Sequence, residues 1–204
     1  MLTPKLVELT VRAASVCRRL KHCNKGIAAL EFGYVVPIMA MMFLGTVELS
    51  QAITVDRRVS QIASSTADLV ARHKSVDEAK LNGFMLLIDQ LMKPYNENLL
   101  KLTITNVYAT IAAPEAPIVC WSYSRKDGND TRAVNTYAKG DSFSTLPTGI
   151  VTGGTSVIVV EAQYDYEPLI FNTFIKTTLP MKETFYLKPR LSASVTYEPA
   201  AACV

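Results

Sequence analysis

Hydrophobic residues dominate one stretch near the start of the chain. From Ile27 to Thr46 the sequence reads IAALEFGYVVPIMAMMFLGT, and Glu31 is the one charged residue in it. At a rise of about 1.5 Å per residue, a helix of this length spans about 30 Å, the thickness of a membrane hydrocarbon core. The pattern therefore predicts a membrane-spanning helix. A buried core helix would show the same pattern, so the flanking charges are needed to choose between the two.

After this stretch the pattern changes to that of an amphipathic helix. Apolar residues recur at steps of three and four between Val47 and Val70, whereas most charged residues fall on other faces. Neither proline nor glycine interrupts this part of the sequence. One continuous helix over residues 27–72 is the prediction, and its second half would lay an apolar stripe on a soluble domain.

The rest of the chain combines one more helix with strands. Ser75, followed three residues later by Glu78, is a capping-box pattern, and it predicts a second helix that ends before Pro94. Beyond it, four β-rich runs separated by turn-forming residues predict four strands of an antiparallel sheet. These runs are LLKLTITNVYAT, PIVCWSYSR, SVIVVEAQYDYEP and ETFYLKPRLSASVTYE. The polar segment 125–154, punctuated by glycine, predicts a loop with one short helical turn.

Together these elements predict an α+β protein in three parts. Residues 1–26 form a leader, residues 27–72 form the long helix, and residues 73–204 form a domain built on a small antiparallel sheet. A chain of 204 residues is long enough for one compact domain with an appended helix.

The positive charge of the chain is concentrated ahead of the apolar stretch. Residues 1–26 contain six basic residues and one acidic residue, a local net charge of +5 against +3 for the whole chain. Because Lys and Arg resist translocation, this cluster favours the membrane helix, keeps the N-terminus in the cytoplasm and exports the bulk of the chain. No basic stripe with interleaved aromatic residues follows, so we expect no nucleic-acid partner.

The apolar helix is expected to remain in the mature protein. A conventional secretory signal has a cleavage site of small residues after its apolar run. The sequence GTVELSQAITVDRR, which follows here, offers no such site.

The four cysteines agree with this topology. Cys17 and Cys23 fall on the cytoplasmic side, whereas Cys120 and Cys203 fall on the exported side, where disulfides persist. We therefore predict a disulfide between Cys120 and Cys203. The alternative is two separate thiols, because the sequence does not show that the two side chains meet.

The residues offer no pattern typical of an enzyme, a cofactor site or a metal site. The two histidines, His22 and His73, lie far apart in the sequence, so there is no zinc-type pair. Asp165 and Glu167, in AQYDYEP, would share one face of a strand and suit a cation. A half-exposed strand with alternating polar and aromatic residues explains them as well. We expect no catalytic activity, no cofactor and no metal.

Glu31 needs a chemical explanation. An ionisable side chain at the bilayer centre costs about 2.5 to 3.5 kcal/mol, so it requires a partner. In one interpretation Glu31 reaches back to the cytoplasmic interface near Lys25. In another, the chain is cut after Gly26, and the new ammonium group of Ile27 lies four positions from Glu31, so that the two charges pair within a subunit or between neighbours. The cut would also remove the basic leader, whose repulsion opposes close packing of helix N-termini.

A basic leader, Gly26, Ile27 and Glu31 ahead of an apolar helix resemble the class III signal of type IV pilin-like proteins. The longer sequence GIAALEFGYVVPIMAMMFLGTVELSQAI, with Pro37 and the segment 45–48, is similar to the TadE/TadG-like minor pilins of the tight adherence (Tad, or Flp) pilus. The later sequences ADLVAR, YDYEPL and YLKPRLS extend the similarity weakly.

The resemblance implies a type IV pilin-like fold and a role in pilus assembly. A membrane aspartyl prepilin peptidase would cut between Gly26 and Ile27 at the cytoplasmic face, and Glu31 would align the subunit in the fibre or priming complex. The major Flp pilin is very short, so this chain resembles a minor pilin or pseudopilin that initiates, caps or regulates the fibre. Its partners would be other pilins, the inner-membrane assembly platform and the lipid bilayer, with the C-terminal domain in the bacterial periplasm.

The alternative function is a permanent anchor. The chain would then keep its leader, cross the inner membrane once and present a periplasmic ligand-binding domain. Its pocket would lie around Tyr164, Asp165, Tyr166 and Glu167.

Overall fold

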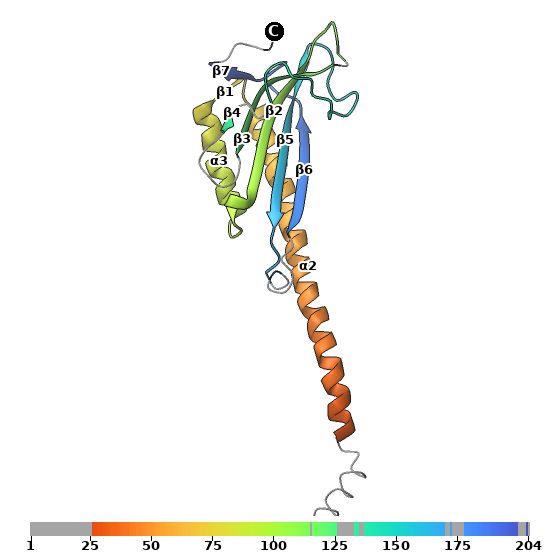
Figure 1. The fold of residues 1–204 in the computed structure, drawn as a ribbon. Helices are drawn as coiled ribbons and strands as arrows, with labels where there is room; N and C mark the ends of the chain where they lie inside the picture. Colours follow the sequence, from red (N-terminus) through yellow and green to blue (C-terminus); the bar gives the residue numbers. More distant parts are fainter. Residues whose placement is uncertain are drawn as a thin grey trace, which may run out of the picture. The chain divides into compact units, whose positions relative to one another are not determined.

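The computed structural model describes residues 26–114, 116–125, 133–134, 137–169, 172, 178–199 and 203. The chain divides into two compact units, Met1–Val47 and Glu48–Val204. Its elements (Figure 1) are, in chain order, α2 (Ile27–Ala71), β1 (Ser75–Asp77), α3 (Glu78–Met92), η2 (Glu97–Leu99), β2 (Leu100–Ala109), β3 (Ile118–Arg125), β4 (Ala133–Val134), β5 (Thr155–Tyr166), β6 (Leu179–Leu187) and β7 (Thr196–Glu198). The boundary between the units falls within α2, so its two parts are described separately.

The long helix α2 confirms the predicted continuous helix. It runs for 45 residues with Pro37 inside it. A proline is tolerated inside a membrane helix more readily than in a soluble one. After Val47, a buried stripe repeats at steps of three and four, as the amphipathic pattern predicted. The buried residues of α2 are Glu48, Val55, Val59, Ile62, Ala63, Thr66, Ala67, Val70 and Ala71.

The second helix, α3, is capped by a different residue from the predicted one. Asp77 is the N-cap, and its carboxylate accepts a hydrogen bond from the backbone N–H of Lys80 at 2.7 Å. This bond lowers the pKa of the Asp77 carboxyl. Ser75, the predicted cap, lies instead in β1, where it pairs in parallel with Thr196 of β7. The helix ends before Pro94, as predicted.

The main sheet has five strands in the order β4-β3-β2-β5-β6, and all neighbours are antiparallel. A separate sheet of two strands pairs β1 with β7. The predicted antiparallel sheet is confirmed, but its last strand was predicted wrongly, because β6 and β7 are separate strands. Pro189 has no backbone N–H for a strand ladder, and β6 ends at Leu187, just before it.

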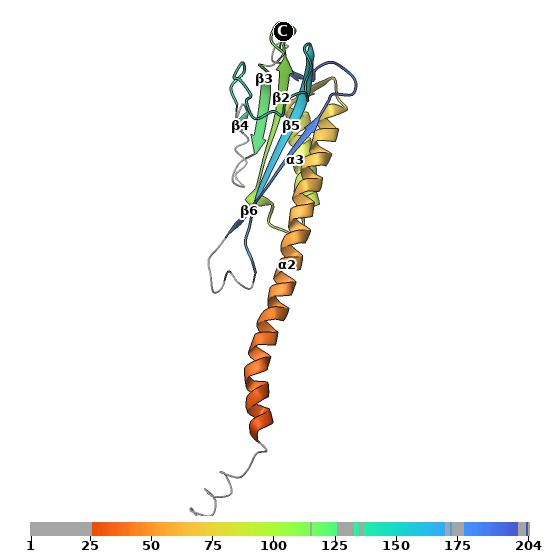
Figure 2. The same cartoon turned by 90° about the vertical axis from the view of Figure 1, so that its right-hand side faces the viewer.

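The main hydrophobic core lies on the inner face of the sheet. The part of α2 after Val47 and the helix α3 cover this face (Figure 2). Leu102 and Ile104 of β2 and Ile158 of β5 are among the residues fully buried beneath the helices. A smaller cluster on the outer face packs neighbouring strand residues against Phe143.

The segment 125–154, predicted as a loop, also contributes the short strand β4, which pairs with β3. Residues 137–154 form turns and bends without the predicted helical turn, apart from an isolated bridge at Ser142. The rest of the positions where that turn was predicted lie outside the described residues. Gly140 and Gly154 have φ angles of 91° and 83°. Glycine adopts this left-handed region without the strain of a side chain, so these turns depend on it.

Candidate functional site

The first part of α2, residues 27–47, is apolar and exposed on every face. None of its residues is buried, and the mean hydropathy reaches 1.9 in this helix. A water-soluble protein rarely exposes so large a continuous apolar surface. In the part of the chain that the structure describes, α2 is the one helix long and apolar enough to cross a membrane. This agrees with a single membrane anchor near the N-terminus.

Gly26, Ile27 and Glu31 lie at the N-terminal end of this apolar surface. Gly26 directly precedes α2, Ile27 opens the helix, and Glu31 follows one turn later. Because residues four apart share a helix face, Ile27 and Glu31 lie on the same side of α2. All three residues are exposed, and no ion pair joins Glu31 to another described residue. The carboxylate therefore faces the same surroundings as the apolar residues around it.

Glu48, at the end of the apolar part, is a residue to which sequence reasoning gave no role. Its side chain is buried, with 8% exposed. Its Oε1 accepts a hydrogen bond from the backbone N–H of Leu169 at 2.5 Å and one from the Tyr166 hydroxyl at 3.4 Å. A signal was present in the sequence, because Glu48 lies seven residues before Val55 on the stripe that turns toward the core.

The tyrosine partner of Glu48 is held in its protonated form. Burial, and after it the nearby charge of Glu48, raise the pKa of Tyr166 to about 12. The hydroxyl therefore keeps its proton at neutral pH and remains a donor. Glu48 thus connects the helix to the end of β5 by one backbone donor and one side-chain donor.

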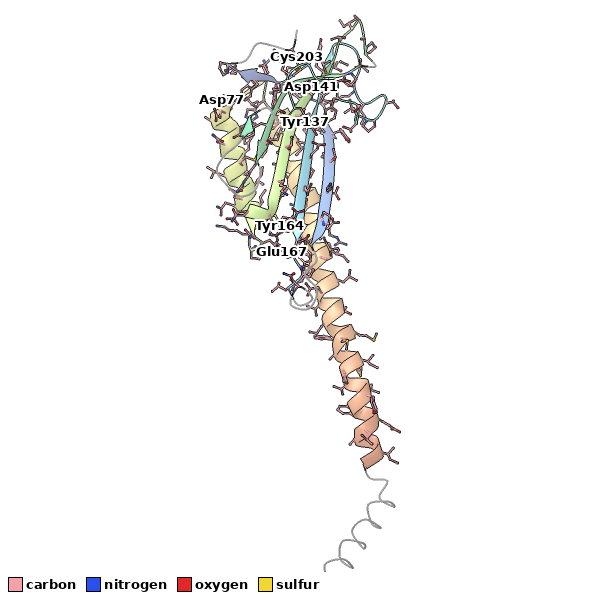
Figure 3. All side chains as sticks on the ribbon, in the orientation of Figure 1. Asp77, Tyr137, Asp141, Tyr164, Glu167 and Cys203 are labelled. Atoms are coloured by element: carbon pink, nitrogen blue, oxygen red, sulfur yellow. A yellow bond between two sulfur atoms is a disulfide. The ribbon has the colours of Figure 1, made fainter. Side chains whose placement is uncertain are left out.

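Asp165 and Glu167, the two carboxylates considered for a cation, lie in different environments. Asp165 accepts hydrogen bonds from the side chains of Gln163 and Lys101, each at 3.1 Å, and these two donors lower its pKa. β5 ends at Tyr166, so Glu167 follows the strand instead of sharing a strand face with Asp165 (Figure 3). Among the described residues, no group of three His, Cys, Asp or Glu is placed to hold a metal ion.

A hollow of about 480 Å³ lies on the outer face of the main sheet. Lys101, Glu161 and Lys182 are among its lining residues, but Tyr164, Asp165, Tyr166 and Glu167 are not. Tyr164 and Tyr166 lie in the main core instead. Of its five charged lining residues, three have partners within the chain, namely Lys101, Arg125 and Glu161.

These partners come from three parts of the domain. The Tyr137 hydroxyl donates to Glu161 at 2.9 Å, and Lys101 pairs with Asp165. Arg125, another lining residue, forms an ion pair with Asp89 of α3. Three basic and two acidic side chains line the hollow, and three of these five charges are already paired within the chain, which weakens the attraction of the hollow for a charged ligand.

The predicted disulfide between Cys120 and Cys203 is present. Their Cα atoms lie 5.2 Å apart, and the bridge joins positions separated by 83 residues. It ties the C-terminal segment to β3, and Figure 3 shows Cys203 at the end of the sheet opposite Tyr164. Cys17 and Cys23 lie outside the described residues, as does the rest of the leader before Gly26.

Comparison with known proteins gives one match, which covers most of the long helix α2. Residues 26–68 match the family model described as TadE-like protein. The matched segment begins at Gly26 and includes Glu31 and Glu48, and it confirms the resemblance to TadE-like proteins. No curated protein and no solved structure matches the chain. The match associates the chain with Tad pilus proteins in general.

Proposed function

From its TadE-like helix at residues 26–68 we propose that the chain is a minor pilin or pseudopilin of the tight adherence pilus. In this proposal it is cut after Gly26 and acts in assembly, priming or capping of the fibre. The observation that carries the proposal is the apolar helix surface, exposed on every face, that opens with Ile27 and Glu31. Such a surface suits lipid before assembly and the helices of neighbouring subunits afterwards.

The cut would complete the chemistry of this surface. It would create an ammonium group on Ile27, on the same face of α2 as Glu31. Paired charges are tolerated in a membrane better than an isolated one, so the ammonium group would offset the cost of Glu31. Pairing between neighbours would also set the axial position of one subunit against the next.

The proposed topology follows from the charge distribution. The basic leader would remain in the cytoplasm, where a prepilin peptidase removes it, and Glu48–Val204 would lie in the periplasm. Other pilins and the inner-membrane assembly platform would then be the partners. The disulfide between Cys120 and Cys203 supports this placement, because disulfides persist in the periplasm.

The first test concerns the cut. In the native host, the intact mass of the membrane form should correspond to a chain that begins at Ile27. Gly26→Leu should retain the leader. A Cβ at Gly26 would meet no described atom within 4 Å, so we expect the fold to accept this substitution. Gly33→Leu is the matched control, because Gly33 has the same open space and should leave the cut unchanged.

One result would end the proposal. A wild-type chain that still begins at Met1, in cells whose peptidase cuts the major pilin, would show that no processing occurs. Normal processing of Gly26→Leu would place the recognition elsewhere in the chain.

The second test concerns Glu31. Glu31→Gln removes the charge at nearly constant size, so insertion and processing should continue while piliation falls sharply. Glu31→Asp keeps the charge and should retain more piliation than Glu31→Gln. Shed pili and membrane-bound subunit are measured by immunoblotting of the same cells. Wild-type piliation in Glu31→Gln would contradict the assembly role.

The uncleaved anchor is a second candidate, favoured by the hollow on the outer face of the sheet. It predicts a retained leader and saturable binding of a small charged molecule. Glu161→Ala should abolish that binding, while Glu167→Ala, outside the hollow, should not. The pairing of the hollow's charges within the chain makes this the weaker candidate.

A further inference from the structure

The outer end of the membrane span can be located along α2 by its length. Starting from Ile27, a hydrocarbon core of about 30 Å takes up about 20 residues of helix. The span therefore ends close to Val47, the last residue of the first compact unit. Glu48 comes next and is buried in the folded domain. It marks the level at which the chain leaves the hydrocarbon.

Two described residues that flank the connection between β5 and β6, Leu169 and Leu179, are held near this level. The backbone N–H of Leu169 donates to Glu48 at 2.5 Å, which fixes Leu169 beside the helix. Leu179, which opens β6, pairs with Tyr166, and the hydroxyl of that tyrosine donates to Glu48. These contacts all lie within the folded unit that begins at Glu48.

The ends of this connection expose apolar side chains. Leu169 is 72% exposed and Leu179 is 46% exposed. Exposed apolar groups close to a membrane surface are typical of segments that bind its interfacial region.

We propose that Leu169 and Leu179 form a membrane-contact surface that enters the interfacial region of the leaflet facing the folded domain. The occupant is lipid, because Glu48 holds both residues at the level where the span ends, so lipid surrounds them before any partner arrives. The contact gives the domain a second attachment to the bilayer and limits its tilt about the helix. This inference rests on the membrane span of the proposed function.

The test uses tryptophan as a depth probe. The full chain carrying Leu169→Trp is reconstituted in phosphatidylcholine vesicles whose acyl chains are brominated near the headgroup, in both leaflets, so that the orientation of the protein does not matter. The native Trp121, which is 5% exposed in the domain core, supplies a background that the unsubstituted chain measures. Leu169→Trp should add fluorescence to this background. The brominated lipid should quench a large part of the added fluorescence.

Two further tryptophan variants serve as the negative and the positive control. Ile111→Trp places the probe at an exposed apolar site, 81% exposed, just beyond the opposite end of β2. β2 has ten residues, so its two ends lie about 30 Å apart at 3.3 Å per residue, and this probe should escape quenching. Phe43→Trp, at a residue 69% exposed within the span, should be quenched by lipid brominated deeper in the chain.

The variants separate three ways in which the proposal could fail. Quenching of Phe43→Trp without quenching of Leu169→Trp would overturn the membrane contact and leave the span standing. Escape of Phe43→Trp from quenching would overturn the span itself, and the membrane contact with it. Quenching of Leu169→Trp that is absent at high protein density and appears only on dilution of the protein in the vesicles would show that a second chain displaces lipid from the surface, which overturns lipid as its occupant.

Discussion

The two parts of α2 belong to one uninterrupted helix but are adapted to different surroundings. Before Glu48, apolar side chains point in every direction and none is buried. After it, a single stripe is buried, and small residues such as Ala63 and Ala67 are fully covered. The backbone is the same in both parts. The surroundings differ: the first part is suited to fluid lipid, which adapts to the shape of the helix, and the second part packs against a protein core, which does not.

The difference teaches that composition controls the first part and shape controls the second. Lipid chains rearrange around a methyl group, so the first part requires mainly that its residues be apolar. A protein core is packed about as densely as an organic crystal, so adding or deleting a single methylene group changes the stability of the fold. Matched substitutions in the two parts should therefore have different effects.

The largest expected effect is confined to the folded unit. Replacing both Cys120 and Cys203 by serine opens the disulfide, and in the chain-entropy model this lowers the free energy of unfolding by about 4 kcal/mol. Urea unfolding of the full chain in detergent micelles, followed by the fluorescence of Trp121, measures the loss. Cys17→Ser with Cys23→Ser is the control and should leave the urea midpoint unchanged. Equal midpoints for both double variants would contradict the structural role of the bridge.

Glu48, where the two parts of the helix meet, should give the next largest effect. Glu48→Ala leaves the N–H of Leu169 and the hydroxyl of Tyr166 without their acceptor, so the free energy of unfolding should fall by about 1.5 to 3 kcal/mol. Glu48→Gln keeps a carbonyl oxygen as acceptor and should lose less. The same urea titration ranks the variants. If the glutamine variant were as unstable as the alanine variant, Glu48 would not stabilise the domain by accepting these two hydrogen bonds.

A matched pair of alanines tests the comparison directly. Ala63→Leu forces extra volume into the core and should lower the free energy of unfolding by about 1 to 3 kcal/mol. Ala40→Leu makes the same change on the exposed apolar part and should leave the unfolding of the domain unchanged. Membrane retention of both variants, measured by fractionation, should match the wild type. Equal destabilisation by the two substitutions would contradict the division of α2 into two environments.

The sequence predicted the elements that follow from a sustained pattern. The start of α2 at Ile27 and its end near residue 72 follow from an apolar run that passes into a helical stripe, with neither proline nor glycine between residues 46 and 72. The second helix and most strands follow from their periods. The disulfide partners follow from the side of the membrane on which each cysteine is expected. Each of these predictions depends on a pattern of many residues or on the redox state of a cellular compartment, so no single tertiary contact decides whether the prediction is correct.

The wrong prediction at Ser75, and the contacts for which no prediction was made, lie where one tertiary contact decides the outcome. Ser75 has the pattern of a cap, but its backbone is used by the pairing of β1 with β7, which comes from the far end of the chain. Arg58, a charged residue within α2, donates to the backbone oxygens of Leu91 and Lys93 at the end of α3. The partners of Glu48 lie more than a hundred residues away in the sequence. Local patterns contain no information about such partners.

The smallest expected effect comes from two glycines that lie in the helices of the two units. Gly83 of α3 has open space for a Cβ and is exposed, so Gly83→Ala should raise the free energy of unfolding by about 0.5 to 1 kcal/mol. The gain arises because alanine has less backbone entropy to lose than glycine when the helix forms. Gly33→Ala makes the same change where a Cβ also meets nothing, but in the apolar part of α2, and should leave the urea midpoint of the domain unchanged. A midpoint raised equally by both substitutions would mean that the apolar part of α2 unfolds together with the domain, and the comparison between the two parts would then fail.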